Sequence, residues 1–241
     1  MSSQTARVAI VTGSSGGLGS ATVDALAADG WQVAAMDTNL EGASPKTESV
    51  VPMLVDVTDS RAVNEAVAEV ADRLGPPGVL VNVAGTNRIS PLLETSDELW
   101  DFLLDLNLKG TFICCRAVVP HMMENGGGRI INMSSIFGIR GEANEVAYSA
   151  AKAGVIGLTR ALATEMAPHG ITVNALAPVM TLTPRVAALP EEFRALQLSK
   201  IPLGRYGTVD DVVNTVLFLV SEGGAFYSGQ TFSANGGDTM P

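Results

Sequence analysis

The sequence is poor in charged residues, aromatic residues and cysteine. Asp, Glu, Lys and Arg make up 17% of its 241 residues and aromatic residues 5%, whereas a soluble domain typically carries about 25% charged residues. Hydrophobic residues reach 46%, which excludes a disordered chain, a coiled coil and collagen. A chain of this length buries about 70% of its unfolded surface, so it needs no disulfide or metal to fold.

The two cysteines, Cys114 and Cys115, are adjacent in the sequence. Neighbouring residues on a helix do not form an ordinary disulfide without distortion. Neither cysteine has metal-ligand spacing to His121 or His169. We therefore predict two buried packing side chains and no metal site.

Long hydrophobic runs and basic residues are also scarce. No apolar run approaches the roughly 18 residues of a membrane helix, and Met1–Arg7 lacks the apolar core of a signal peptide, so we expect a cytoplasmic protein. There are 15 Lys and Arg against 25 Asp and Glu, which gives a net charge of −10. This balance argues against nucleic acid and anionic membranes as partners. It also leaves open where an anionic ligand would find positive potential.

Short β-branched runs alternate with longer amphipathic stretches along the chain. Such alternation predicts a parallel sheet covered by helices on both faces. No repeat or low-complexity linker interrupts it, so we predict a single α/β domain over residues 1–241, with a Rossmann-type doubly wound sheet. The expected strands are Arg7–Val11, Trp31–Met36, Val51–Val55, Gly78–Val83, Gly128–Met133, Ile171–Ala177 and Gln230–Ala234. The expected helices are Gly17–Asp29, Ser60–Leu74, Ser96–Asn125, Val146–Ala167 and Asp210–Ser221.

A glycine-rich segment, Thr12–Gly19, joins the first expected strand to the first helix. Backbone N–H groups and about half a positive charge gather at a helix N-terminus, and glycines allow a close approach of the ligand. The spacing departs from G-x-G-x-x-G, and a plain strand-to-helix turn is the alternative. We predict a dinucleotide site at Gly13, Ser15, Gly17, Leu18 and Gly19.

Asp37 follows the second expected strand, 18 residues beyond Gly19. An acid about 20 residues beyond the glycines typically binds the ribose 2′-hydroxyl of NAD, and its carboxylate would repel a 2′-phosphate. No Lys or Arg occurs from Thr12 to Glu41. A solvated aspartate is the alternative. We predict that the cofactor is NAD rather than NADP.

Together with Tyr148-Ser-Ala-Ala-Lys152, these features resemble the short-chain dehydrogenase/reductase family over nearly the whole chain, as far as Asn235-Gly-Gly. Within the family, the sequence is similar to the branch of 3-oxoacyl-carrier-protein reductases. The resemblance implies further cofactor contacts, although Val83 and Val179 replace a usual Asn and Gly. The implied contacts are Asp56, Val57, Asn82, Ala84, Gly85, Pro178 and Thr183.

Tyr148 and Lys152 are four residues apart on an expected helix, so their side chains share a face. A phenol has a pKa near 10, and a neighbouring ammonium favours the phenolate. Tyr148 can then exchange the alcohol proton as general base or acid. An ordinary helix with an incidental Tyr and Lys is the alternative. The resemblance adds a second role for Lys152, a hydrogen bond to the nicotinamide ribose.

Ser135 ends the fifth expected strand, at the sheet edge where ligands bind. It precedes Tyr148 by 13 residues, the separation that the family shows between its catalytic Ser and Tyr; Ser134 is one residue too distant. Asn107 matches the family's helix Asn that holds the Lys through water, and a polar residue at a helix kink is its alternative. We predict a catalytic tetrad of Asn107, Ser135, Tyr148 and Lys152.

Residues 184–201 do not fit the alternation of strands and helices, and the resemblance implies that they form a lid over the substrate. The apolar residues of this segment, together with Ile136 and Phe137, favour a substrate with hydrocarbon character. The alternative is that they belong to the core or to a subunit interface. The stretches where related carrier-protein reductases are basic read Met123–Gly126 and Pro168–Gly170, without Lys or Arg. Arg88 and Arg140 are interpreted as solvated rather than as anion ligands.

Three functions follow. The first is an NAD(H)-dependent oxidoreductase that interconverts a secondary alcohol and a ketone. The second is a 3-oxoacyl-thioester reductase acting on an acyl-carrier protein or CoA thioester. The third is a catalytically silent NAD-binding sensor or scaffold, which an intact tetrad disfavours. The resemblance also implies a homotetramer, in which surface buried between subunits would account for the low charge.

Overall fold

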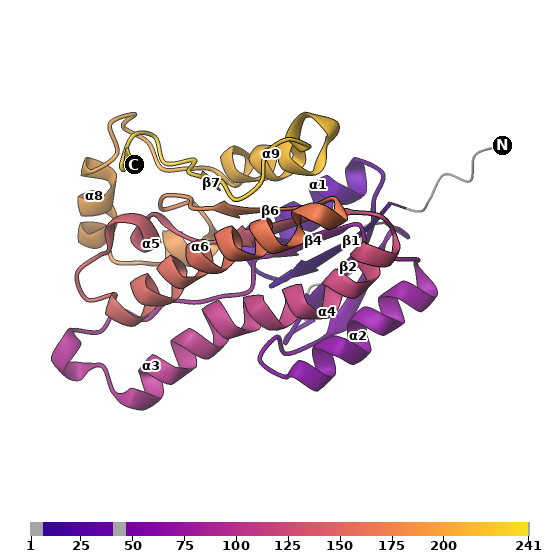
Figure 1. The fold of residues 1–241 in the computed structure, drawn as a ribbon. Coiled ribbons are helices and arrows are strands. Elements are labelled where there is room, and N and C mark those ends of the chain that lie inside the picture. Colours follow the sequence, from indigo (N-terminus) through magenta and orange to yellow (C-terminus); the bar gives the residue numbers. More distant parts are fainter. Residues whose placement is uncertain (1–6, 41–46, 241) are drawn as a thin grey trace.

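The computed structural model describes residues 7–40 and 47–240 and arranges its strands in one parallel sheet of seven (Figure 1). The order is β3-β2-β1-β4-β5-β6-β7, so the direction of winding reverses between β1 and β4. Open sheets of this kind bind ligands at that reversal, beyond the carboxyl ends of the strands. The strands are β1 Val8–Thr12, β2 Gln32–Asp37, β3 Val50–Leu54, β4 Val79–Asn82, β5 Gly128–Met133, β6 Ile171–Leu176 and β7 Thr231–Phe232.

Helices cover both faces of the sheet (Figure 1). Residues of α2, α4 and α6 form one apolar core with one face, and α1 and α9 form a second core with the other. This confirms the predicted single-domain, doubly wound α/β fold. The helices are α1 Gly17–Ala28, α2 Ser60–Arg73, α3 Asp97–Leu104, α4 Gly110–Glu124, α5 Ile136–Arg140, α6 Val146–Met166, α7 Pro184–Ala187, α8 Glu191–Ser199 and α9 Val209–Val220.

The long helix expected over Ser96–Asn125 is interrupted. Asp105–Lys109 forms a π-helical turn between α3 and α4, and such turns occur frequently at functional sites. Cys114 and Cys115 are both 2% exposed in the α4 core, as predicted, and burial raises the pKa of the Cys115 thiol to about 12. These thiols are therefore inert packing groups at neutral pH.

Two expectations involve residues outside the described ranges. The signal-peptide expectation rests mostly on residues 1–6, and the stretch without Lys or Arg ends at Glu41; the structure describes neither. Within the described residues, no helix combines the length and the apolar character needed to cross a membrane.

Candidate active site

A cavity of about 570 Å³ opens at the carboxyl ends of the strands. The segments that follow β1 to β6 line it together with α7 and α8. Of the residues predicted for the site, only Asn82 and Asn107 lie outside the lining. The predicted residues that line the cavity are Gly13, Ser15, Gly17, Leu18, Gly19, Asp37, Asp56, Val57, Ala84, Gly85, Ser135, Tyr148, Lys152, Pro178 and Thr183.

The glycine turn is packed too tightly for side chains at two positions. Gly13 has φ +66°, and a Cβ on it would lie 2.7 Å from the Ala84 backbone. A Cβ on Gly19 would lie 2.0 Å from the Gly13 carbonyl oxygen. The N-cap of α1, Gly16, makes no side-chain hydrogen bond, and the first turn holds no acidic residue. The first N–H groups of α1 therefore face the cavity without a side-chain cap, which fits a bound diphosphate.

We expect Gly19→Ala to lower the melting temperature by several degrees and to weaken NADH binding at least about tenfold. The added methyl group must displace the Gly13 backbone and distort the turn. Thermal unfolding and NADH fluorescence titration measure the two effects. Gly16→Ala is the control for stability, because its Cβ would stay 3.4 Å from the Gly13 oxygen. Equal melting temperatures for the two variants would contradict the steric argument.

Asp37 lies at the end of β2, beside the glycine turn. Its carboxylate accepts hydrogen bonds from the backbone N–H groups of Ser15 (3.0 Å) and Asn39 (3.2 Å). Asp56 is fixed in a similar way by the N–H and hydroxyl of Thr58. Among the described side chains that line the cavity, Lys152 is the only Lys or Arg. The end of the cavity beside the glycine turn is therefore acidic at its side chains and positive only at its backbone.

Tyr148 and Lys152 extend from the first turns of α6 into the cavity. The Lys152 Nζ lies 5.6 Å from the centre of the Tyr148 ring and donates a hydrogen bond to the Met133 carbonyl oxygen (2.8 Å). The Phe137 ring packs edge-on against Tyr148, with ring centres 6.4 Å apart. Burial lowers the pKa of Lys152 to about 8, which still leaves the ammonium predominantly charged at pH 7.

Ser135 follows β5 by two residues, at the carboxyl edge of the sheet, and it is the N-cap of α5. Its hydroxyl oxygen accepts a hydrogen bond from the Phe137 N–H (3.1 Å). The hydroxyl proton can therefore be donated to a ligand. Ser134, the neighbouring candidate, donates its own hydroxyl to the Lys152 carbonyl oxygen (2.8 Å), which fixes the segment after β5 to α6.

Asn107 sits in the π-helical turn and is fully buried. Its amide nitrogen donates to the carbonyl oxygens of Thr86 and Leu103, both at 2.9 Å. Its Oδ1 is buried and has no hydrogen-bond partner among the described protein atoms. A Cβ placed on Gly85 would lie 2.5 Å from this oxygen and 3.2 Å from the Lys152 Nζ. The two polar atoms thus lie near the same point beside Gly85.

The side chain of Asn82 belongs to a buried network rather than to the cavity. Its amide nitrogen donates to the Asn132 side-chain oxygen (2.9 Å), and Asn132 donates in turn to the Thr159 hydroxyl. This network connects β4, β5 and α6 below the site. Any contact of Asn82 with a cofactor would therefore come from its backbone.

Sequence reasoning missed Thr12, whose buried hydroxyl oxygen accepts hydrogen bonds from the N–H groups of Val83 and Ala84, both at 3.2 Å. These bonds span 71 and 72 residues and fix the glycine turn beside the segment that follows β4. No local sequence pattern signals a contact over this distance. Thr183 closes the other side of the turn, because a Cβ on Gly17 would lie 3.1 Å from its side chain.

The segment expected to form a lid contains α7 and α8, and it carries Val186, Leu189 and Phe193 into the cavity lining. Val179, which replaces a usual glycine, packs with Ile136 and Ile201 in a third apolar cluster.

The interpretation of Arg140 as solvated is wrong. Its guanidinium bonds Asp238 (2.9 Å) and Glu142 (2.5 Å), and Lys200 joins the same Glu142 (3.0 Å).

A glycine turn that leads from a central strand into the cavity of a doubly wound sheet defines a Rossmann-type dinucleotide-binding protein. The chain belongs to the short-chain dehydrogenase/reductase family of oxidoreductases, whose members bind a nicotinamide cofactor. The family described as "Enoyl-(Acyl carrier protein) reductase" matches residues 13–239.

Several curated proteins are similar over almost their full length. The 3-oxoacyl-[acyl-carrier-protein] reductase FabG of Thermotoga maritima is 39% identical, and the match covers 96% of this chain and 97% of that protein. The (2S)-[(R)-hydroxy(phenyl)methyl]succinyl-CoA dehydrogenase subunit BbsD of Thauera aromatica is also 39% identical, with 97% of each chain covered. The crystal structure of gox2181 superimposes with a TM-score of 0.92 at 32% identity, covering 97% of this chain and 96% of that one.

Proposed function

We propose that this protein is an NAD(H)-dependent oxidoreductase that interconverts a secondary alcohol and a ketone. The observation that carries the proposal is that Ser135, Tyr148 and Lys152 line one cavity with the glycine turn. The bound nicotinamide supplies or accepts the hydride. The residues of the chain orient the substrate and move its proton.

In this proposal, Tyr148 is the general acid and base. The Lys152 ammonium favours the phenolate through its positive charge, and the Ser135 hydroxyl donates a hydrogen bond to the substrate oxygen. Lys152 also hydrogen-bonds the nicotinamide ribose, as the family resemblance implies. Asn107 is a positioning residue: its buried Oδ1 holds Lys152 through a water molecule, which would satisfy an otherwise unpaired buried acceptor.

The glycine turn and the acids beside it hold the nucleotide. The N–H groups at the start of α1 bind the diphosphate, and Asp37 accepts hydrogen bonds from the adenosine ribose. Asp56 and Val57 contact adenine, and Thr183 holds the carboxamide. The first turn of α1 carries no side-chain cap and lines the cavity, which supports a diphosphate there, and Asp37 disfavours the additional phosphate of NADP. The cofactor is therefore NAD.

A 3-oxoacyl-thioester reductase is the second candidate, because the Thermotoga maritima relative is named for such a substrate and the Thauera aromatica relative for a CoA thioester. Both reactions use the same proton transfer. The absence of Lys and Arg from Met123–Gly126 and Pro168–Gly170 favours a CoA thioester over an acidic carrier protein, which needs a basic docking patch.

The test is a panel of small ketones, secondary alcohols, acyl-CoA and acyl-carrier-protein thioesters, run in both directions with both cofactors. NADH-dependent turnover of small ketones supports the first function. Turnover confined to thioesters supports the second. NADH binding without turnover across the panel would contradict both and leave a sensor or scaffold.

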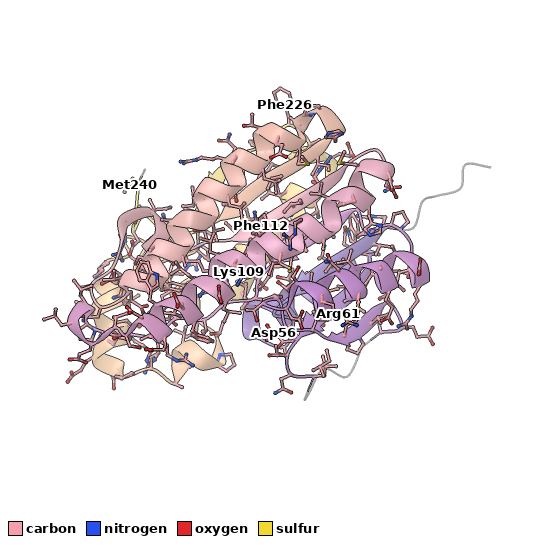
Figure 2. All side chains as sticks on the ribbon, turned by 60° about the horizontal axis from the view of Figure 1, so that its bottom comes forward. Asp56, Arg61, Lys109, Phe112, Phe226 and Met240 are labelled. Atoms are coloured by element: carbon pink, nitrogen blue, oxygen red, sulfur yellow. The ribbon has the colours of Figure 1, made fainter. Side chains whose placement is uncertain are left out.

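We also propose that the chain forms a homotetramer. Trp100, Phe102 and Phe112 on α3 and α4 are 37%, 47% and 42% exposed, and Phe226 beyond α9 is 101% exposed. Figure 2 shows Phe112 and Phe226 on separate parts of the surface, as two different subunit contacts would require. Light scattering at micromolar concentration should give about four times the 25.0 kDa of the chain; a monomer mass would contradict this proposal.

A further inference from the structure

Gln197 on α8 has a feature that the proposed chemistry does not use. The residue lines the cavity and is only 2% exposed. Its amide nitrogen Nε2 is buried and has no hydrogen-bond partner among the described atoms. Buried donors in proteins are nearly always paired, and each exception calls for an explanation.

Other contacts hold α8 in place, so the fold does not depend on the Gln197 amide. The Tyr206 hydroxyl donates to the Arg194 carbonyl oxygen (2.8 Å), and the Arg194 side chain donates to the Leu189 carbonyl oxygen (3.1 Å). Lys200, just after the helix, is paired with Glu142. An apolar residue of similar length would therefore fill the position of Gln197 without leaving an unpaired donor.

We propose that Gln197 determines substrate specificity by donating a hydrogen bond from Nε2 to a second carbonyl oxygen of the substrate, apart from the oxygen that reacts. This inference rests on the proposed ketone and alcohol chemistry. The preferred substrates are then ketones or secondary alcohols that also carry a carbonyl group, such as an ester or thioester.

The surroundings of Gln197 indicate that this second carbonyl group is uncharged. The lid side chains around the cavity, Val186, Leu189 and Phe193, are apolar. Lys152, the only described cation of the lining, is held by the Met133 carbonyl oxygen beside Tyr148. A carboxylate at Gln197 would be buried without a counter-charge, which is far more costly than a neutral carbonyl group.

The test uses three probes with NADH: ethyl 3-oxobutanoate, 4-ethoxybutan-2-one, which replaces only the ester carbonyl by a methylene group, and 3-oxobutanoate, which carries a carboxylate. Their kcat/KM values are compared for the wild type, Gln197→Met and the control Leu196→Met. Leu196 is adjacent on α8, but it is 56% exposed and outside the cavity lining. The ratio of keto ester to keto ether within one variant, compared between variants, removes the different intrinsic reactivities of the two ketones.

In Gln197→Met, we expect the ratio of kcat/KM for the keto ester to kcat/KM for the keto ether to fall about 10- to 100-fold, because the ester carbonyl oxygen loses its hydrogen-bond donor while the ether had none to lose. The ratio should not change in Leu196→Met, and the wild type should prefer the ester to the carboxylate at least about tenfold. The melting temperature of Gln197→Met should equal or exceed that of the wild type, because the variant has no unpaired buried donor.

An unchanged ester-to-ether ratio in Gln197→Met, with both ketones turned over, would overturn the assignment of Gln197 alone. A wild type that prefers the carboxylate would overturn the uncharged second carbonyl. If the wild type reduced no ketone of the series with NADH, the proposed function would fail, and this inference with it.

Discussion

Replacement of Tyr148 by Phe is expected to lower kcat at least about a hundredfold while NADH still binds. The phenol oxygen is the proposed proton donor and acceptor, and general acid–base catalysis typically contributes two to four orders of magnitude. The ring itself remains, so its edge contact with Phe137 and the packing of α6 should persist. Steady-state rates measure the first effect, and NADH fluorescence titration measures the second.

Tyr227→Phe is the matched control for this experiment. It removes the same hydroxyl group from a tyrosine that packs between Phe218 and Phe232, outside the cavity lining. Its kcat should stay within about twofold of the wild-type value, as expected for a surface change. Near-normal turnover by Tyr148→Phe would contradict the catalytic assignment. Loss of both turnover and NADH binding would show a structural defect instead.

The second large effect concerns the choice of cofactor: kcat/KM with NADH should exceed that with NADPH at least about a hundredfold. Like charges brought together at a binding site cost several kcal/mol, and each 1.4 kcal/mol is a factor of ten. The Asp37 carboxylate lines the cavity, where no described Lys or Arg other than Lys152 offsets its charge. Lys152 is committed to Met133 and Tyr148, at the nicotinamide end in our proposal.

Asp37→Asn tests the cause of this preference, because it removes the charge and keeps the shape. We expect the NADH-to-NADPH ratio to fall at least about tenfold, through a gain with NADPH and a smaller loss with NADH. The Asn side-chain oxygen can still accept a hydrogen bond from Ser15 or Asn39, so the turn should stay formed. A wild type that uses NADPH as well as NADH would contradict the proposed role of Asp37.

The geometry of the glycine turn explains how a chain with a net charge of −10 can offer positive potential to an anionic ligand. An acidic chain can hold a diphosphate because the positive potential at the glycine turn comes from backbone N–H groups of α1, which no side chain caps. Basic side chains are not needed there. The acidity of the chain and an anionic ligand are therefore compatible.

Much of this protein follows from local sequence patterns. Hydrophobic strands alternating with helices determine a doubly wound sheet, because only helices on both faces can cover strands that are apolar on both sides. The requirement for Gly19 is also local, since a Cβ there would meet the Gly13 backbone within the same turn. Tyr148 and Lys152 share a face because they are one helical turn apart.

The remaining features depend on contacts between residues that are distant in the sequence, and only the tertiary structure decided them. Thr12 bonds a segment 71 residues away, and Asn107 turns its oxygen toward Lys152 through a π-helical turn that the helical periodicity of the sequence does not predict. The sequence alone does not distinguish Gln197 from an ordinary polar residue of a surface helix. Its burial without a partner exists only because α8 folds over the carboxyl ends of the strands, and burial in space is not encoded in the spacing along one helix.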